Sequence, residues 1–159
     1  MSFSIFLSLT GKQQGLISSG CNTIDSIGNK YQKGHADEIQ VISLNHSMSR
    51  DEHCNLHPVE FIKPIDKSSP LIGIAVTNNE MLTAIFEVYR LNQNGVLEMF
   101  YKIKLTEASI IKVSSIYPSV INSAEVMPYE QIAFKYKSIT WEHKLAGTSG
   151  YSIWEDRIY

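Results

Sequence analysis

Residues 81–105 read MLTAIFEVYRLNQNGVLEMFYKIKL, and this stretch decides the fold class. Its two ends are rich in aliphatic, β-branched and aromatic residues, which strands favour. Between them lies Asn92-Gln93-Asn94-Gly95, whose Asn-Gly pair is typical of a tight hairpin turn. Beyond the turn, apolar residues alternate with charged ones, which is the period of a strand with one buried face. The stretch therefore predicts an antiparallel hairpin with strands at 81–91 and 96–105.

Further strands are predicted on both sides of this hairpin. Phe3, Ile5, Leu7 and Leu9 share one face of an N-terminal strand, with serine and threonine opposite. The other expected strands cover 37–47, 59–63, 111–117, 131–144 and 151–154. In the longest of them the apolar parity changes, which predicts a β-bulge near Lys137-Ser138. Residues 16–33 are expected to form mostly loop with one short extended piece, and residues 48–58 a polar loop.

One helix is predicted, at about residues 69–78. Ser69 is a suitable N-cap, and Pro70 follows at the first helical position, where its missing N–H costs nothing. Leu71, Ile74 and Ala75 then recur at helical spacing. Seven or eight short strands with a single helix predict a mainly antiparallel sandwich or barrel.

Some strands carry large apolar residues on both faces, which predicts association. The set Met81, Ile85 and Tyr89 lies opposite the set Leu82, Phe86 and Val88. A small barrel can bury both faces of such strands only against its helix or against a neighbouring subunit. We therefore expect an obligate oligomer.

Length and composition limit the number of domains and the class of protein. The 159 residues suit one domain, 1–159, and 43% apolar with 19% charged residues is usual for a globular protein. A net charge of −2 without basic blocks excludes a nucleic-acid footprint. The N-terminus lacks the charged and apolar regions of a signal peptide, and no apolar run is long enough to insert into a membrane. Two cysteines fit synthesis in a reducing cytoplasm.

Several ordered strings resemble the haemolysin-coregulated protein (Hcp) family of type VI secretion systems, over nearly the whole chain. They are GHADEIQV at 34–41, FIKPIDKSSPL at 61–71, FEVYR at 86–90, YKSITW at 136–141 and SIWEDR at 152–157. The resemblance implies an antiparallel β-barrel of two sheets with one flanking helix. It also implies a homohexameric ring, stacked rings forming an exported tube, a contractile sheath, a spike protein at the tip, and secreted effectors in the lumen.

The loop at 48–58 is predicted to carry ring stacking. Its polar and charged side chains have no apolar period that would hold them in a barrel, and loops at barrel ends are free to carry function. The residues are Arg50, Asp51, Glu52, His53 and His57. Compared with many relatives this loop is short, whereas the glycine-rich stretch 11–34 is longer. That stretch is the second candidate for stacking.

No constellation of catalytic or metal-binding residues is evident. His53-Cys54-Asn55-Leu56-His57 lacks the two separated ligand pairs usual for zinc, which favours a polar surface loop. Gly15–Gly20 has the glycine spacing of a phosphate-binding loop, but Cys21-Asn22 stand where lysine and serine are required. The sequence therefore gives no indication of a cofactor or of enzymatic activity, and the resemblance implies a structural tube subunit. A monomeric ligand-binding β-barrel is the alternative.

Overall fold

The fold is described by a computed structural model for residues 3–122 and 126–154. Strands make up 52% of the described residues and helices 11%, so the protein is mainly β, as the sequence predicts. Every strand pairing within these residues is antiparallel. The part of the predicted C-terminal strand at 155–157 lies outside the described residues.

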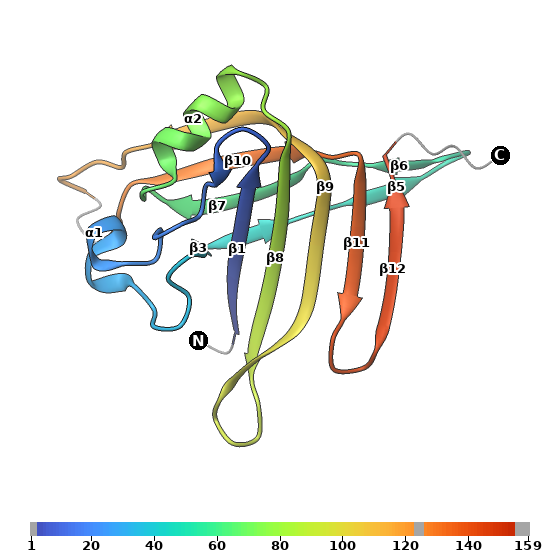
Figure 1. Ribbon diagram of the computed structural model, residues 1–159, viewed down its shortest axis with the longest axis horizontal. Helices are drawn as coiled ribbons and strands as arrows, with labels where there is room; N and C mark the ends of the chain where they lie inside the picture. The colour runs from blue at the N-terminus through green and yellow to red at the C-terminus, as the bar shows by residue number, and fades with distance from the viewer. Residues whose placement is uncertain (1–2, 123–125, 155–159) are drawn as a thin grey trace.

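The elements follow one another along the chain as shown in Figure 1. The described strands are β1 (Phe3–Gly11), β2 (Gly15–Leu16), β3 (Ile39–Val41), β4 (Ser43–Asn45), β5 (Met48–Arg50), β6 (Cys54–Leu56), β7 (Val59–Pro64), β8 (Leu82–Leu91), β9 (Leu97–Ile116), β10 (Tyr129–Lys135), β11 (Ser138–His143) and β12 (Thr148–Ile153). The helical segments are α1 (Ile24–Ile27), a 3-10 turn (Gly28–Lys30) and α2 (Ser69–Thr77).

Two sheets face each other and close into a barrel, which confirms the predicted architecture (Figure 1). The large sheet has the order β2-β1-β8-β9-β11-β12, and the small sheet has the order β9-β10-β7-β4. Residues 39–45 close the barrel, because β3 pairs with β1 and β4 pairs with β7. Between these two pairings Ile42 N–H donates to Ile62 O at 2.7 Å. The strand predicted at 37–47 is therefore divided between two neighbours.

The β8–β9 hairpin forms where the sequence predicts it. The side-chain oxygen of Asn92 accepts the backbone N–H groups of Asn94 at 2.8 Å and of Val96 at 3.1 Å. Gly95 has φ 75°, a left-handed conformation that glycine adopts without steric cost. The turn chemistry of Asn and Gly thus sets the register of the two longest strands.

Strand β9 is one continuous strand, whereas two strands at 96–105 and 111–117 were predicted. Its first half pairs with β8 and β11, and its second half pairs with β10. The chain bends at Glu107, whose φ of 49° is unusual for a residue other than glycine. Apolar alternation is lost there because the strand leaves one sheet for the other. No glycine, proline or asparagine lies between residues 106 and 110 to end it.

The change of parity near Lys137 has a different cause from the predicted bulge. The chain leaves β10 at Lys135 and enters β11 at Ser138, so residues 136 and 137 form a corner between the small and the large sheet. A register shift occurs earlier, between Ala133 and Phe134, where β10 pairs with β9. The prediction of one continuous strand at 131–144 was therefore wrong, although the place of the parity change was right.

Helix α2 confirms the predicted helix, with two differences. Ser68, not Ser69, precedes the first helical residue, and neither serine provides a side-chain cap to the helix. The buried residues of the helix are Ile72 and Ala75, whereas Ile74 is 45% exposed. The helix therefore packs on the barrel through Ile72 and Ala75, and the predicted contact through Ile74 is not made.

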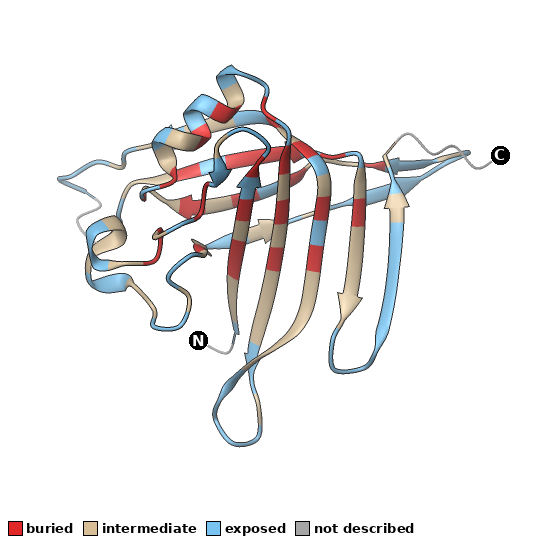
Figure 2. Ribbon diagram, viewed as in Figure 1, coloured by how far each residue is buried: buried red, intermediate tan, exposed pale blue. Residues whose placement is uncertain are grey.

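The core lies where the two sheets overlap, and the hairpin ends of the large sheet extend beyond it (Figure 2). Its centre is an aromatic group formed by Phe61, Phe86 and Phe134. Phe61 stacks on Phe134 with ring centroids 5.3 Å apart, and Phe86 reaches both from the opposite sheet, at 5.3 and 6.3 Å. These rings join the two sheets to each other.

A charged cluster is buried beneath the start of α2. Lys63 is fully buried, and its Nζ lies 2.7 Å from a carboxylate oxygen of Glu130 and 3.0 Å from one of Asp66. The same ammonium donates to Ser69 Oγ at 3.1 Å. Burial raises the pKa of the neighbouring Cys21 thiol to about 11, and the negative charge of Asp66 adds to the effect. The cluster fixes the turn between β7 and α2.

The segment between β2 and β3 is more ordered than the predicted loop. It contains the single helical turn α1 and the following 3-10 turn. The side-chain oxygen of Asn22 accepts a hydrogen bond from Gln32 N–H and another from Gln40 Nε2, both at 2.8 Å. His35 stacks on Phe6 of β1, with ring centroids 3.9 Å apart. This stretch is therefore tied to the barrel.

The turn after β1 is held by a buried carboxylate. Glu80 accepts the backbone N–H of Gln13 at 3.1 Å and of Gln14 at 3.0 Å, and the Gln14 side-chain amide at 3.1 Å. Burial alone would raise the pKa of Glu80, but the hydrogen bonds from Gln14 and Gln13 outweigh it and lower the pKa. A Cβ at Gly11 would lie 1.9 Å from Glu80 Oε2, so only glycine fits beside this carboxylate.

Replacing Glu80 by glutamine is expected to cost about 1–2 kcal/mol at pH 7, because hydrogen bonds to a charged acceptor are lost. A folded pKa below the ordinary value of 4.5 contributes stability above that value, which disappears as the pH falls through the folded pKa. The difference between the two proteins should therefore shrink at acidic pH. Urea unfolding at pH 7 and pH 4 measures it. Glu107→Gln, at an exposed position, is the control, and an equal loss in both variants would contradict this account.

Candidate assembly surfaces

The segment predicted as a polar loop at 48–58 is a two-stranded ribbon that projects from the barrel (Figure 1). In it β5 pairs with β6, with Met48 opposite Leu56 and Arg50 opposite Cys54. The ribbon has no other strand partner among the described residues. Its sequence lacks apolar alternation because both of its faces are largely exposed, which is why it read as a loop. An isolated two-stranded ribbon is only marginally stable in water, so this surface favours a partner.

The base of the ribbon is fixed by Tyr136. Its hydroxyl donates to the backbone oxygen of His57 at 2.9 Å, and it lies 2.8 Å from His46 Nε2. Since the hydroxyl hydrogen is used for His57, the His46 nitrogen must donate. Burial lowers the pKa of His46, and burial likewise raises the pKa of the Tyr136 hydroxyl. Leu56 is buried in the barrel core. The ribbon therefore leaves the barrel in a defined direction.

The five residues predicted for stacking divide between the two ends of the ribbon. Arg50, Asp51 and Glu52 are exposed and follow one another at the tip. His53 is half-buried beside them. His57 lies at the base, where its Nε2 is 2.9 Å from Ser49 Oγ. Three of the predicted charged residues therefore lie together at the tip, and His57 lies away from them at the base.

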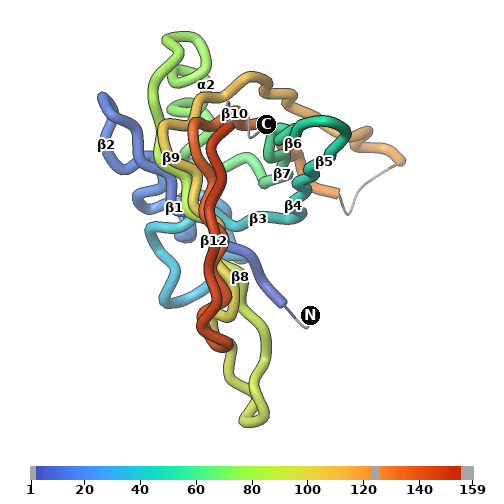
Figure 3. The backbone as a smooth tube through the Cα atoms, turned by 90° about the vertical axis from the view of Figure 1, so that its right-hand side faces the viewer, coloured from blue at the N-terminus to red at the C-terminus, as the bar shows by residue number. Residues whose placement is uncertain are grey.

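A second surface is the edge of the large sheet at β12. This strand pairs with β11 alone within the described residues, so its outer backbone groups have no strand partner there. Figure 3 shows β12 running along the near side of the molecule. Tyr151 is 74% exposed and Ile153 is 40% exposed. Residues 148–153 contain no charge and no proline, the usual devices that protect an edge strand from pairing.

The apolar set predicted for association is divided by the structure. Leu82 and Phe86 belong to the core. On the outward face Met81 is 44% exposed, and Ile85 and Tyr89 are half-buried. Burial and a hydrogen bond to Glu87 raise the pKa of the Tyr89 hydroxyl, so that it remains a donor at neutral pH. This outward face is the remaining candidate patch for contact between subunits.

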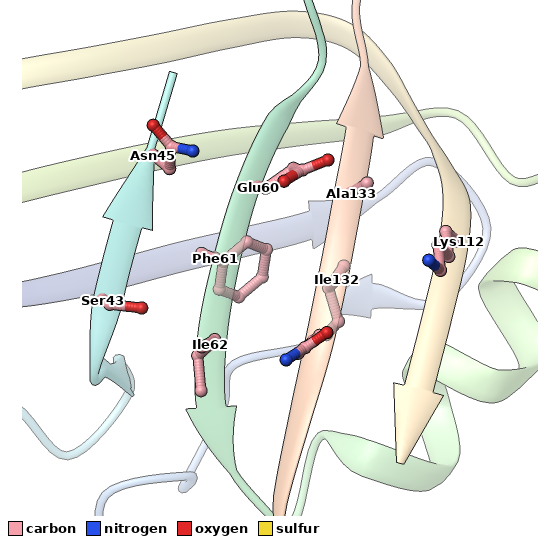
Figure 4. A pocket seen from close by; sticks show the side chains of 9 residues that line it. Ser43, Asn45, Glu60, Phe61, Ile62, Lys112, Ile132 and Ala133 are labelled. Atoms are coloured by element: carbon pink, nitrogen blue, oxygen red, sulfur yellow. The ribbon is translucent and has the colours of Figure 1, made fainter. Parts of the chain in front are cut away.

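A third surface is a groove on the outward side of the small sheet (Figure 4). It is lined by Ser43, Asn45, Glu60, Phe61, Ile62, Lys112, Gln131, Ile132 and Ala133. No sequence pattern predicts this groove, because its residues come from four strands that are far apart in the chain. The groove is lined by both polar and apolar side chains, and Ala133 lies in it between Glu60 and Lys112.

The described residues offer little for metal chemistry or for crossing a membrane by a helix. Among residues 3–122 and 126–154, no three His, Cys, Asp or Glu side chains are grouped so that they could hold a metal ion. Cys54 and His57 remain separate parts of the ribbon, and Cys54 is exposed. Neither helix of this part of the chain is long and apolar enough to span a bilayer.

Comparison with known proteins gives a family match over most of the chain. The family model described as "Type VI secretion system effector, Hcp" matches residues 6–143. The chain is 35% identical over 170 residues to the "Major exported protein" of Pseudomonas aeruginosa, covering 99% of each sequence.

Solved structures agree with this match. The chain is similar to a crystal structure of an Hcp protein, with a TM-score of 0.92 and 31% identity, covering 98% of this chain and 99% of that one. It is also similar to the secreted protein Hcp3 from Pseudomonas aeruginosa, with a TM-score of 0.88 and 34% identity, covering 98% and 100% of the two chains.

Proposed function

Since this chain belongs to the Hcp family of type VI secretion proteins, we propose that it is the structural subunit of a secretion tube. Six copies form a ring, rings stack into a tube, and the tube is exported by a contractile sheath with a spike protein at its tip. The subunit is made in the bacterial cytoplasm and is itself exported, and secreted effectors travel in the ring lumen. Its role is mechanical, with no catalysis.

One observation carries this proposal: the match to Hcp proteins covers the chain from end to end in both sequence and structure. Two features of the fold support it. The β12 edge is uncharged and unpaired in the described chain, and the ribbon projects beyond the barrel. A closed ring needs two different patches on each subunit, because its interface is head-to-tail. The fold has more than two candidate patches of this kind.

The test is the mass and shape of the purified protein. Size-exclusion chromatography with light scattering should give six times the 18.0 kDa of one chain, and negative-stain images should show rings. A monomer at high concentration would overturn the proposal. It would favour the alternative of a monomeric ligand-binding barrel, for which the groove on the small sheet is the available site.

We expect ring stacking to depend on the tip of the ribbon. Replacing Arg50, Asp51 and Glu52 by serine should shorten or abolish tubes while leaving single rings. Exposed ion pairs contribute only about 0–1 kcal/mol each, but every ring repeats them. Tube length by negative stain across an ionic-strength series measures the effect. If the tubes persist unchanged, the stacking contact belongs instead to residues 11–34.

A further inference from the structure

We propose that a notch on the small sheet, formed by Glu60, Ala133 and Lys112, receives the ribbon tip of a neighbouring copy of this chain. The inference rests on the proposed self-assembly and names the surface that the tip contacts. Glu60 and Lys112 would pair with the successive charges Arg50, Asp51 and Glu52 of the other copy.

The notch is built by strand register. Ala133 of β10 lies directly opposite Glu60 of β7 on one side and directly opposite Lys112 of β9 on the other. The three side chains therefore point to the same face of the sheet. Two strand spacings separate Glu60 from Lys112, which is about 10 Å. The small methyl group of Ala133 leaves the space between the two charges open (Figure 4).

The charges of the notch are not used within the subunit. Glu60 and Lys112 are both exposed, and neither takes part in an ion pair within residues 3–122 and 126–154. By contrast, Glu107 of β9 and Glu142 of β11 each have a lysine partner within 4 Å, at 3.3 and 3.1 Å. The notch thus presents one negative and one positive group at a fixed separation.

The tip of the ribbon carries the complementary arrangement. Arg50, Asp51 and Glu52 are exposed, and none of them has an ion-pair partner in the described part of the chain. With the Arg50 guanidinium against Glu60, the adjacent carboxylates fall on the Lys112 side. A partner with only one sign of charge would leave one wall of the notch unpaired. The order of charges therefore favours this chain itself over a uniformly acidic or basic partner.

The contact must be between copies. Arg50 lies five residues beyond Asn45, which lines the groove beside the notch, so an extended chain carries the tip up to about 17 Å away. Tyr136 and Leu56 fix the ribbon base, so the tip cannot fold back to its own notch. Tip and notch are different patches, and such a pair makes a head-to-tail contact that repeats from subunit to subunit.

A charge-reversal experiment on the full chain tests the pairing. Glu60→Lys and Arg50→Glu each place like charges together and should reduce tube length at least fivefold at low salt, measured by negative stain and sedimentation velocity. Combining the two changes restores opposite charges and should recover most of that length. Glu107→Lys makes the same charge change at an exposed position of β9, outside both candidate stacking segments, and should leave the tubes unaltered.

The outcomes separate this inference from the proposed function. Rings and tubes of normal length in Glu60→Lys would overturn the notch contact while leaving the tube proposal standing. A double variant no better than its parents would also overturn it. Absence of rings in the unmutated protein would overturn the proposed function itself. Circular dichroism confirms folding, and should Glu60→Lys fail to fold, Glu60→Gln must shorten the tubes or the inference is wrong.

Discussion

Replacing Lys63 by alanine is expected to lower the free energy of unfolding by about 3–5 kcal/mol. The substitution removes the ammonium that lies 2.7 Å from Glu130 and 3.0 Å from Asp66, and both carboxylates are buried. Uncompensated charge in the interior cannot be solvated, so most of the loss comes from the partners left behind. Urea unfolding followed by circular dichroism measures it.

Two further variants separate charge from packing. Lys63→Met keeps the apolar stem of the side chain, so a charge effect predicts nearly the same loss as alanine. Lys137→Ala breaks an exposed pair with Glu107 at 3.3 Å and should cost at most about 1 kcal/mol. Equal losses of unfolding free energy in Lys63→Ala and Lys137→Ala would show that the buried cluster stabilises the fold no more than an exposed ion pair does.

Replacing Phe134 by alanine is expected to cost about 3–5 kcal/mol, because it leaves a cavity between the two sheets. Phe134 is fully buried, and its ring contacts Phe61 of the same sheet and Phe86 of the opposite one. The remaining aromatic rings are held by different strands and can close the cavity only in part. Chemical unfolding at neutral pH gives the loss directly.

The matched control is Phe3→Ala, which removes the same ring at a position that is 54% exposed. A surface change of this kind should alter stability by about 0.5 kcal/mol or less. If Phe134→Ala were as mild as Phe3→Ala, the sheets would be held together by contacts other than the aromatic group.

The parts of the fold that were predictable are those set by local chemistry. Asn92 and Gly95 define a turn without help from distant residues, and Pro70 after Ser69 marks a helix start wherever it occurs. Counting such elements predicted an antiparallel sandwich or barrel. These features needed only neighbours in the sequence, and the family resemblance then supplied their arrangement.

The predictions that were wrong concern features that depend on contacts between residues far apart in the chain. The break predicted between residues 105 and 111 was absent because β9 changes sheet while its backbone remains paired. The ribbon gave no apolar alternation because both of its faces are largely exposed, and only Leu56 at its base packs into the barrel. Both the continuous strand β9 and the ribbon depend on which strands pair with each other, and the side-chain pattern does not reveal that pairing.

The buried cluster was also missed, although a signal existed. Lys63 has the same parity as Val59 and Phe61, which face the core. That parity predicts an inward lysine, and an inward lysine requires carboxylates. Asp66 is close in sequence, but Glu130 comes from β10 and becomes a neighbour only when the sheet forms. The candidate stacking residues were found by their charge, whereas the Glu60–Lys112 notch depends on strand register.

The unbroken path of β9 has a consequence for how the subunit opens. One strand contributes hydrogen bonds to both sheets, so neither sheet can lose its order without disturbing the other. Amide hydrogens of β8, β9 and β10 should therefore exchange with solvent only through global unfolding, as one cooperative unit. The β5–β6 ribbon lies outside that unit and should exchange far faster in free subunits. The same chain thus combines a barrel that unfolds as a single body with a projecting ribbon that opens independently of it.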